Sequence, residues 1–326
     1  KSSCIMADAY IFLSLKYREF MMKLFEMLSR KRPGHEGVQR RNPTGSKYEH
    51  FDFTPDRFEC SLSSLSHSRE CEGLFLDRYS RDEVMQLLRT VGIADLCAAK
   101  GYRDLLITIA KDNDRIHRFR LYNGKESPGR LLMELRLSEL VYTPDPAMTG
   151  GAIKPQRYNA MAVEWLTLQS PRDRFTDDRP RLPAQDRPGL GGVVQIARLL
   201  ETLAGELSVS AVLDVPSHFH AAVMYSRRFR FTDPKREGMM QGVLRDLGNH
   251  SLADLSWAFV TGDIRDALTG EPVAYVPSEQ VLPVDAGLAR YFTSRYYRQS
   301  SEEAAHARHY AIDIEKMREK RKTIKN

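Results

Sequence analysis

A glycine-rich loop joins an apolar strand to an apolar helix in the middle of this chain, and the rest of the fold must be built around that unit. The strand is predicted over residues 160–169 and the helix over residues 193–207. Between them lie a charged, irregular stretch and then the loop, Pro188-Gly189-Leu190-Gly191-Gly192. Its backbone N–H groups, unobstructed by side chains, lie at the positive end of a helix dipole. The loop is therefore predicted to hold a phosphate or pyrophosphate, with a tight strand-to-helix turn as the alternative interpretation.

The remaining pattern predicts two helices, a meander of antiparallel strands, and then alternating strands and helices. Ser80 and Glu83 have the spacing of a capping box at the start of the first helix. Further helices are predicted over residues 93–100 and 221–228. The predicted strands cover residues 105–110, 116–122, 131–142, 160–169 and 209–215, with the start of another at 229–231. This order predicts an α/β fold with a mixed, largely antiparallel sheet flanked by helices.

The two ends of the chain carry its positive charge. The formal net charge is +6, and the basic excess lies in residues 1–50 and 285–326. Because the middle is slightly acidic, we expect solvated basic ends rather than a nucleic-acid-binding face. Four parts are predicted: a basic amphipathic helix and flexible linker over 1–59, the sheet domain over 60–235, an appended element over 236–285, and a basic C-terminal helix and tail over 286–326. The appended element is predicted to contain a helix at 237–247, a helix or strand at 252–260, and loops over 263–283.

Composition and cysteine usage exclude several classes of protein. Hydrophobic residues make up 42% of the chain and charged residues 28%, which is the balance of a globular rather than a disordered or fibrous protein. The apolar stretch near the start is too short for a transmembrane span. We expect the helix at 7–29 to pack on the body or on a partner, with attachment to a membrane surface as the alternative. The four cysteines, Cys4, Cys60, Cys71 and Cys97, lack metal-binding spacing, which is typical of a reduced, cytoplasmic protein.

The segment from the loop onward is similar to a known family. Ala221 and Tyr225 stand three and seven positions after His218, and Gly189 and Gly191 occupy the two small positions of the loop. These residues resemble the GNAT superfamily of N-acyltransferases, over about residues 80–232. The resemblance implies a GNAT-type fold, here with helical N- and C-terminal extensions, and acetyl-CoA or another acyl-CoA as co-substrate. It also implies that coenzyme A is bound by the loop and the preceding strand, through Arg187, Gly189, Leu190, Gly191, Gly192, Leu166 and Leu168.

The same resemblance implies acyl transfer from the thioester to an amine in a direct ternary complex. Tyr225 would donate a proton to the departing thiolate, and Glu164 would accept a proton from the amine. A backbone N–H near Trp165 would polarise the thioester carbonyl. Judged from the residues alone, Tyr225 also suits a core position and Glu164 a solvated strand position. No Cys or Ser is placed as a nucleophile, which favours direct transfer.

Two departures from the family pattern favour other functions. Asp186 stands where the family has Arg or Gln, and His218 where it has Asn; both favour a catalytically inactive acyl-CoA-binding or regulatory module. A nucleic-acid-associated protein is the second alternative, although we expect no stable nucleic-acid partner. The expected acceptor is an amine on a small molecule or a protein, and a homodimer is left open. We expect no metal, because His218 and His220 lack a third ligand at suitable spacing. Asp214 is interpreted as a substrate contact or a helix cap.

Overall fold

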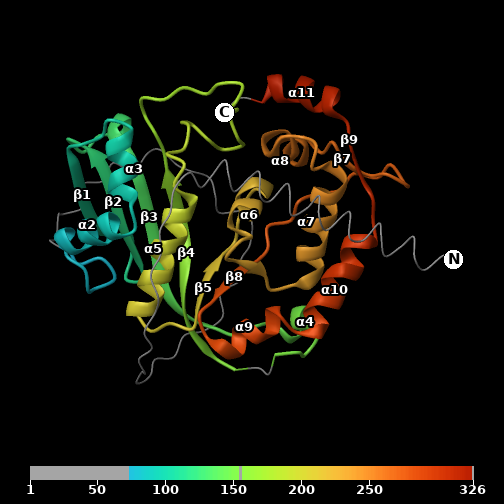
Figure 1. The fold of residues 1–326 in the computed structure, drawn as a ribbon, viewed down its shortest axis with the longest axis horizontal. Helices are drawn as coiled ribbons and strands as arrows, with labels where there is room; N and C mark the ends of the chain where they lie inside the picture. Colours follow the sequence, from blue (N-terminus) through green and yellow to red (C-terminus); the bar gives the residue numbers. More distant parts are fainter. Residues whose placement is uncertain (1–72, 154–155, 325–326) are drawn as a thin grey trace.

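The computed structural model describes residues 73–153 and 156–324 (Figure 1). The predicted N-terminal helix and linker, and Cys4, Cys60 and Cys71, lie outside the described residues. The helices are α2 Arg81–Thr90, α3 Ile93–Ala99, α4 Pro146–Thr149, α5 Val193–Glu206, α6 Phe219–Tyr225, α7 Pro234–Leu247, α8 Leu252–Thr261, α9 Ala286–Phe292, α10 Arg295–His306 and α11 Ile314–Thr323, with a 3₁₀ turn at Pro128–Arg130. The strands are β1 Leu105–Lys111, β2 Ile116–Asn123, β3 Leu131–Tyr142, β4 Tyr158–Leu168, β5 Ala211–Asp214, β6 Arg230–Phe231, β7 Ile264–Asp266, β8 Gln280–Pro283 and β9 Tyr310–Ile312. None of the described helices is long and apolar enough to cross a membrane.

Seven strands form the main sheet in the order β1-β2-β3-β4-β5-β8-β6. Strands β1 to β4 are antiparallel neighbours, β4 and β5 are parallel, and β8 runs antiparallel to both β5 and β6. Helices α2, α3 and α5 cover one face of β1–β4, while α6, α7, α8, α10 and α11 gather beyond β5 and β8 (Figure 1). The predicted mixed, largely antiparallel sheet flanked by helices is therefore confirmed.

The sheet opens between its two parallel strands. Pairing of β4 with β5 covers only residues 160–162 against 211–213, after which β4 continues to Leu168 and β5 ends at Asp214. On its other side, β4 pairs Val163 and Trp165 with consecutive residues of β3, which leaves Glu164 as the extra residue of a β-bulge. A bulge bends a strand and increases its twist. Beyond residue 162, β4 therefore makes no ladder pairs with β5, and we call this unpaired stretch between residues 163–168 and the end of β5 the opening.

The first half of the sheet holds the largest apolar cluster, and local sequence signals explain its helices. Ser80 caps α2 as predicted: its Oγ accepts from the Glu83 N–H at 3.3 Å, and its N–H donates to the Glu83 carboxylate at 2.8 Å. Helix α5 buries Ile196, Leu199 and Leu203 against the same cluster. The positions at i, i+3 and i+7 form one apolar stripe, which is why this helix was predictable from sequence.

The C-terminal third of the chain differs from its prediction. The loops expected over 263–283 are wrong in part, because β8 inserts between β5 and β6 in the main sheet, so the sheet extends past residue 235. The helix-or-strand alternative at 252–260 resolves as α8. Residues 286–326 contain α9, α10, β9 and α11 rather than one helix with a tail. Strands of three or four residues show no readable alternation, so their pairing partners alone identify them.

Helices α7 and α10 approach each other closely at Gly238. A Cβ built there would lie 2.7 Å from the Ala304 Cβ and 2.8 Å from the Ala305 N, and would collide with the Ser301 carbonyl oxygen. We expect Gly238→Ala to lower the free energy of unfolding by about 1–3 kcal/mol, because the helices must separate. In α5, a Cβ at Gly205 would meet nothing within 4 Å, so Gly205→Ala should be neutral or stabilising. Chemical denaturation of both variants tests this; equal stabilities would contradict close packing at Gly238.

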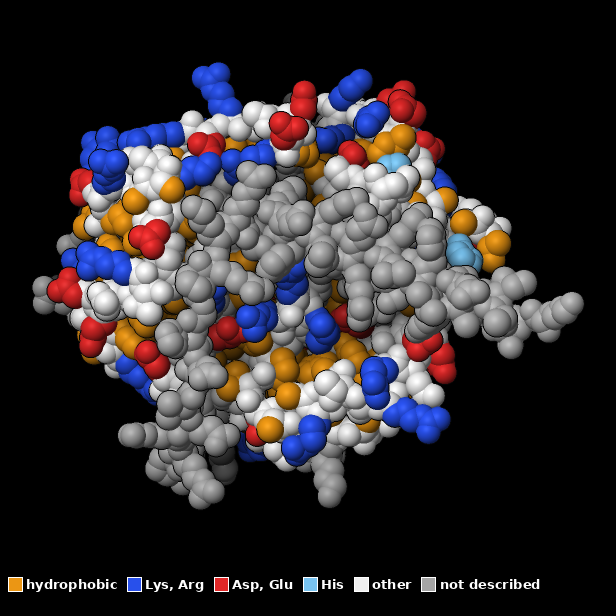
Figure 2. All heavy atoms as spheres, viewed as in Figure 1, with side chains coloured by type: hydrophobic (Ala, Val, Ile, Leu, Met, Phe, Trp, Pro, Cys, Tyr) orange, Lys and Arg blue, Asp and Glu red, His pale blue; other side chains and the backbone are white. Residues whose placement is uncertain are grey.

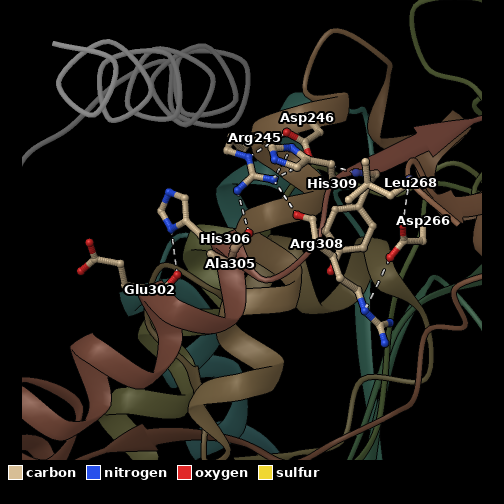
Figure 3. Close-up of polar contacts among 10 residues, drawn as sticks. Arg245, Asp246, Asp266, Leu268, Glu302, Ala305, His306, Arg308 and His309 are labelled. Atoms are coloured by element: carbon tan, nitrogen blue, oxygen red, sulfur yellow. Dashed lines mark hydrogen bonds and ion pairs between the residues drawn. The ribbon is translucent and has the colours of Figure 1, made fainter. Parts of the chain in front are cut away.

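Arg245 joins the end of α7 to the segment that connects α10 with β9 (Figure 3). Its guanidinium donates to the Ala305 carbonyl at 2.6 Å and to the Arg308 carbonyl at 2.9 Å. It also donates to both carboxylate oxygens of Asp246, at 2.7 and 2.6 Å. Burial works against ionisation of Asp246, but Arg245 and the Tyr310 N–H hold the pKa of Asp246 below its ordinary value. A single nearly buried ion pair thus fixes three segments of the C-terminal third.

Candidate functional site

The glycine loop lies beside the open end of β4. Gly189 forms a bridge with Gln169, and the Ser170 N–H donates to the Pro188 carbonyl at 2.7 Å. Gly191 has φ +83°, a left-handed conformation that favours glycine, and a Cβ there would point into open space. Gly192 is the N-cap of the 14-residue α5 and makes no side-chain capping hydrogen bond. The structure thus places a glycine turn, with open space beside it, at the start of a long helix.

The predicted coenzyme A residues on β4 come together with this loop. Leu166 and Leu168 pack against the first apolar cluster, and a Cβ on Gly192 would lie 2.6 Å from Leu168 Cδ2. Leu190 is buried in that cluster, so its side chain anchors the loop and only its backbone is available to a ligand. The loop and the C-terminal end of β4 therefore form one surface.

The charged side chains around the loop are not arranged as their order in the sequence indicates. The Asp186 side chain is 90% exposed and 3.5 Å from Arg181 Nη2, so it turns towards solvent. Arg187 is exposed at the start of the loop. Arg179, which was not among the predicted site residues, donates to the Gly189 carbonyl and, at 3.2 Å, to Asp173. The Arg179 guanidinium therefore adds positive charge at the loop backbone. The sequence did not show this, because the contact depends on how the charged stretch before the loop folds.

Tyr225 ends α6 on the face of the sheet that carries the first apolar cluster. Its ring packs against Phe229 with centroids 5.8 Å apart. Burial raises the pKa of the Tyr225 phenol, and the nearby Asp214 carboxylate raises it further. The hydroxyl makes no hydrogen bond to any described residue. The predicted core and acid roles are thus both compatible with its position, and its environment keeps the phenol protonated.

Asp214 and Gln280 form a buried polar pair next to Tyr225. They are paired directly across β5 and β8, so their side chains share one face. Gln280 Nε2 donates to the Ala222 carbonyl of α6 at 3.2 Å, one turn before Tyr225. Within the described chain, neither Asp214 Oδ2 nor Gln280 Oε1 has a hydrogen-bond partner, although both atoms are buried. Two unpaired acceptors side by side form a place where a hydrogen-bond donor or a proton is favoured.

Glu164 lies on the opposite face of the sheet from Tyr225. Its neighbours Val163 and Leu166 pack on the first apolar cluster, while Glu164 accepts a hydrogen bond from Ser138 Oγ on β3. Because Leu137 also belongs to that cluster, Ser138 and Glu164 face away from it. The two predicted catalytic residues therefore lie on opposite sides of the sheet rather than facing each other.

The histidines near α6 are engaged in packing. The rings of His218 and His220 stack with centroids 5.5 Å apart. His218 Nδ1 is 2.8 Å from Ser217 Oγ, and His220 Nδ1 is 2.8 Å from the buried Ser256 Oγ. Burial, together with His218, lowers the pKa of His220 to about 4, so this ring is neutral at neutral pH. No group of three or more metal-ligating side chains occurs in residues 73–153 and 156–324.

The Asp214 carboxyl makes stability depend on pH. Burial raises its pKa to about 7, and the Val215 N–H only partly opposes this. The folded state favours the protonated carboxyl, so the stabilisation from Asp214 is fully present below pH 4. As the pH rises through 7 this stabilisation is lost, and the free energy of unfolding falls by at most about 4 kcal/mol. We expect Asp214→Asn to raise the melting temperature at pH 8 and to change it little at pH 4. Thermal unfolding of this variant and of the exposed control Asp186→Asn tests the prediction; a pH-independent difference would contradict it.

Leu190 of the loop, Leu166 and Leu168 of β4, and Tyr225 all belong to or pack against the first apolar cluster. The structure adds Asp214 and Gln280 beside Tyr225, and Arg179 on the loop. The sequence predicts Asp214 at a strand end. Its pairing with Gln280 could be seen only once β8 was placed beside β5. Comparison with protein-family models, curated proteins and solved structures gives no match to this chain. A functional proposal therefore rests on the residues and geometry of this site.

Proposed function

We propose that this protein is an acyl-CoA-dependent N-acyltransferase with a GNAT-type fold. The observation that carries the proposal is the glycine loop at the start of α5, directly beside a strand edge that has parted from its parallel neighbour. Helix N-termini with free backbone N–H groups favour phosphates. An extended chain containing amide groups, such as the pantetheine arm of coenzyme A, can pair with an open strand edge. The two features lie next to each other and suit the two parts of one ligand.

Residues on the two faces of the opening suit the two proton transfers of the reaction. Glu164, on one face, accepts a proton from the incoming amine, whose nitrogen then attacks the thioester carbonyl carbon. A backbone N–H of the β4 edge stabilises the oxygen on which negative charge develops. Tyr225, on the other face, donates its proton to the sulfur as the carbon–sulfur bond breaks. The products are an N-acylated amine and free coenzyme A, and both protons are accounted for.

Asp214 affects the protonation state of Tyr225. A buried carboxylate near the phenol favours its protonated form, which is the form that can donate. With a pKa of about 7, Asp214 can exist in either protonation state at neutral pH. A catalytically inactive module that binds acyl-CoA is distinguished from this enzyme by measuring binding and turnover separately.

Ligand binding at the glycine loop should be measurable as stabilisation. We expect coenzyme A or an acyl-CoA at a hundredfold excess over its Kd to stabilise the fold by about 2.7 kcal/mol, which appears as a higher melting temperature. Gly191→Ala should abolish this response, because the methyl group fills the open space beside the loop. Thermal shift and calorimetric titration with acetyl-, butyryl- and palmitoyl-CoA provide the measurement.

A matched variant separates loss of binding from backbone strain. Gly270 has φ +73° and the same open surroundings as Gly191, so Gly270→Ala should impose a similar strain of about 1–2 kcal/mol. It should leave the response to acyl-CoA intact. No stabilisation of the parent protein by any acyl-CoA at millimolar concentration would refute the proposal. Stabilisation without release of free thiol, across a panel of small amines and lysine peptides, would support the binding module instead.

A further inference from the structure

A polar cavity lies where the turn between β2 and β3 meets the chain that leaves β4. Its volume is about 220 Å³, and it is lined by Tyr102, Asn123, Gly129, Arg130, Pro171 and Arg172. Basic side chains gather along the upper-left edge of the molecule in Figure 2, above these same elements of Figure 1. No carboxylate is among the described residues that line the cavity.

Arg172 is held in place from three sides. Its Nη1 donates to the Gly101 carbonyl at 3.1 Å, and its guanidinium lies over the Tyr102 ring, 4.9 Å from the centroid. Its backbone N–H donates to the Tyr102 hydroxyl at 3.0 Å, and that buried hydroxyl also contacts Ser170 Oγ at 2.9 Å. These contacts use one of the five guanidinium N–H donors of Arg172. The side chain is therefore oriented while most of its donors stay available.

Arg130, an exposed residue on the other wall, is held by a single hydrogen bond. Its Nη1 donates to the Asn123 carbonyl at 3.2 Å. Neither Arg130 nor Arg172 forms an ion pair with a described residue. Asp173 is bound by Lys100 and Arg179. Asp104 Oδ2 and Arg130 Nη1 both lie close to Gly124, but they form no ion pair. Two guanidinium groups thus line one cavity, and no carboxylate of the described chain forms an ion pair with either of them.

We propose that this cavity binds the phosphoryl group of a small phosphorylated molecule. Two guanidinium forks match the charge and the geometry of a dianionic phosphate, and the Asn123 amide can supply a further donor. A volume of about 220 Å³ lies below the range of roughly 300–1,000 Å³ that is typical of larger ligands, so the ligand is a phosphate with few attached atoms rather than a nucleotide. The site is independent of the proposed acyl transfer, because none of its lining residues belongs to the glycine loop or to the opening.

Calorimetric titration of the full chain with inorganic phosphate and with glycerol phosphate tests the site and distinguishes a free ion from a phosphate ester. Arg130→Ala and Arg172→Lys should each weaken binding at least about tenfold, the second because lysine keeps the charge but loses the fork. Arg174→Ala removes an equal charge two residues from Arg172, outside the cavity, and should change the Kd less than about twofold. Melting temperatures of all three variants test whether the fold is retained. Arg130 makes one hydrogen bond, to the Asn123 carbonyl, so Arg130→Ala remains informative if Arg172→Lys is unstable.

Three results would overturn the proposal. The first is no binding of either phosphate compound by the parent protein at millimolar concentration. The second is an equal loss of affinity in Arg174→Ala and Arg130→Ala, which would indicate general surface charge. The third is binding that survives Arg130→Ala but disappears in Gly191→Ala, which would place the phosphate at the glycine loop. A failure of acyl-CoA binding leaves this test unaffected, because the two sites share no residue.

Discussion

Replacing Tyr225 with Phe is expected to reduce turnover by about 10²–10⁴-fold while folding and acyl-CoA affinity stay unchanged. This is the factor that a positioned general acid typically supplies. The substitution keeps the ring that packs on Phe229, and it leaves no partner unsatisfied, because the hydroxyl bonds to no described residue. The rate of free thiol release, the melting temperature and the Kd for acyl-CoA are the three quantities to measure.

Two further variants make this result specific. Tyr310→Phe removes a phenol hydroxyl from the apolar cluster of the C-terminal third and should leave turnover unchanged. Glu164→Gln removes the proposed base on the opposite face of the sheet and should also lower turnover without affecting acyl-CoA binding. If Tyr225→Phe retains the full rate in an active preparation, Tyr225 is a core residue and the acid role is refuted.

Replacing Arg245 with Ala should lower the free energy of unfolding by about 3–5 kcal/mol. The Arg245 and Asp246 side chains are only 9% and 16% exposed, and removing Arg245 leaves the nearly buried Asp246 carboxylate with only the Tyr310 N–H and His309 as partners. Two backbone carbonyls that bridge to α10 and its following segment lose their donor as well. Chemical denaturation of the parent and the variant measures the loss.

Arg308→Ala provides the control from the same region. Its ion pair with Asp266 spans 3.8 Å, and the Arg308 side chain is 59% exposed (Figure 3). The Asp266 side chain is 14% exposed but also accepts from the Leu268 and Thr269 N–H groups, so losing this long contact to an exposed guanidinium should cost only about 0–1 kcal/mol. Equal effects of the two substitutions would show that the buried geometry of Arg245 does not stabilise the C-terminal third.

The sequence alone determined the elements whose signals lie within one helix or strand. The capping box of α2, the apolar stripe of α5 and the alternation in β1 to β4 depend on residues at most a few turns apart, and all of them are present in the structure. The position of the glycine loop could be predicted in the same way, because the residue patterns of the strand before it and of the helix after it were both clear. Local periodicity therefore determines where one end of the candidate site lies along the chain.

Only the tertiary structure decided which distant segments meet. Strand β8 has four residues, too few to show a period, yet its insertion between β5 and β6 brings Gln280 beside Asp214. A one-residue bulge at Glu164 places Leu166 and Leu168, rather than Trp165 and Thr167, on the same apolar cluster as Val163, because a shift of one residue reverses the face of every following side chain. The pairing energy of two segments far apart in the chain depends on the residues of both segments. It therefore cannot be predicted from the residue pattern of either segment alone.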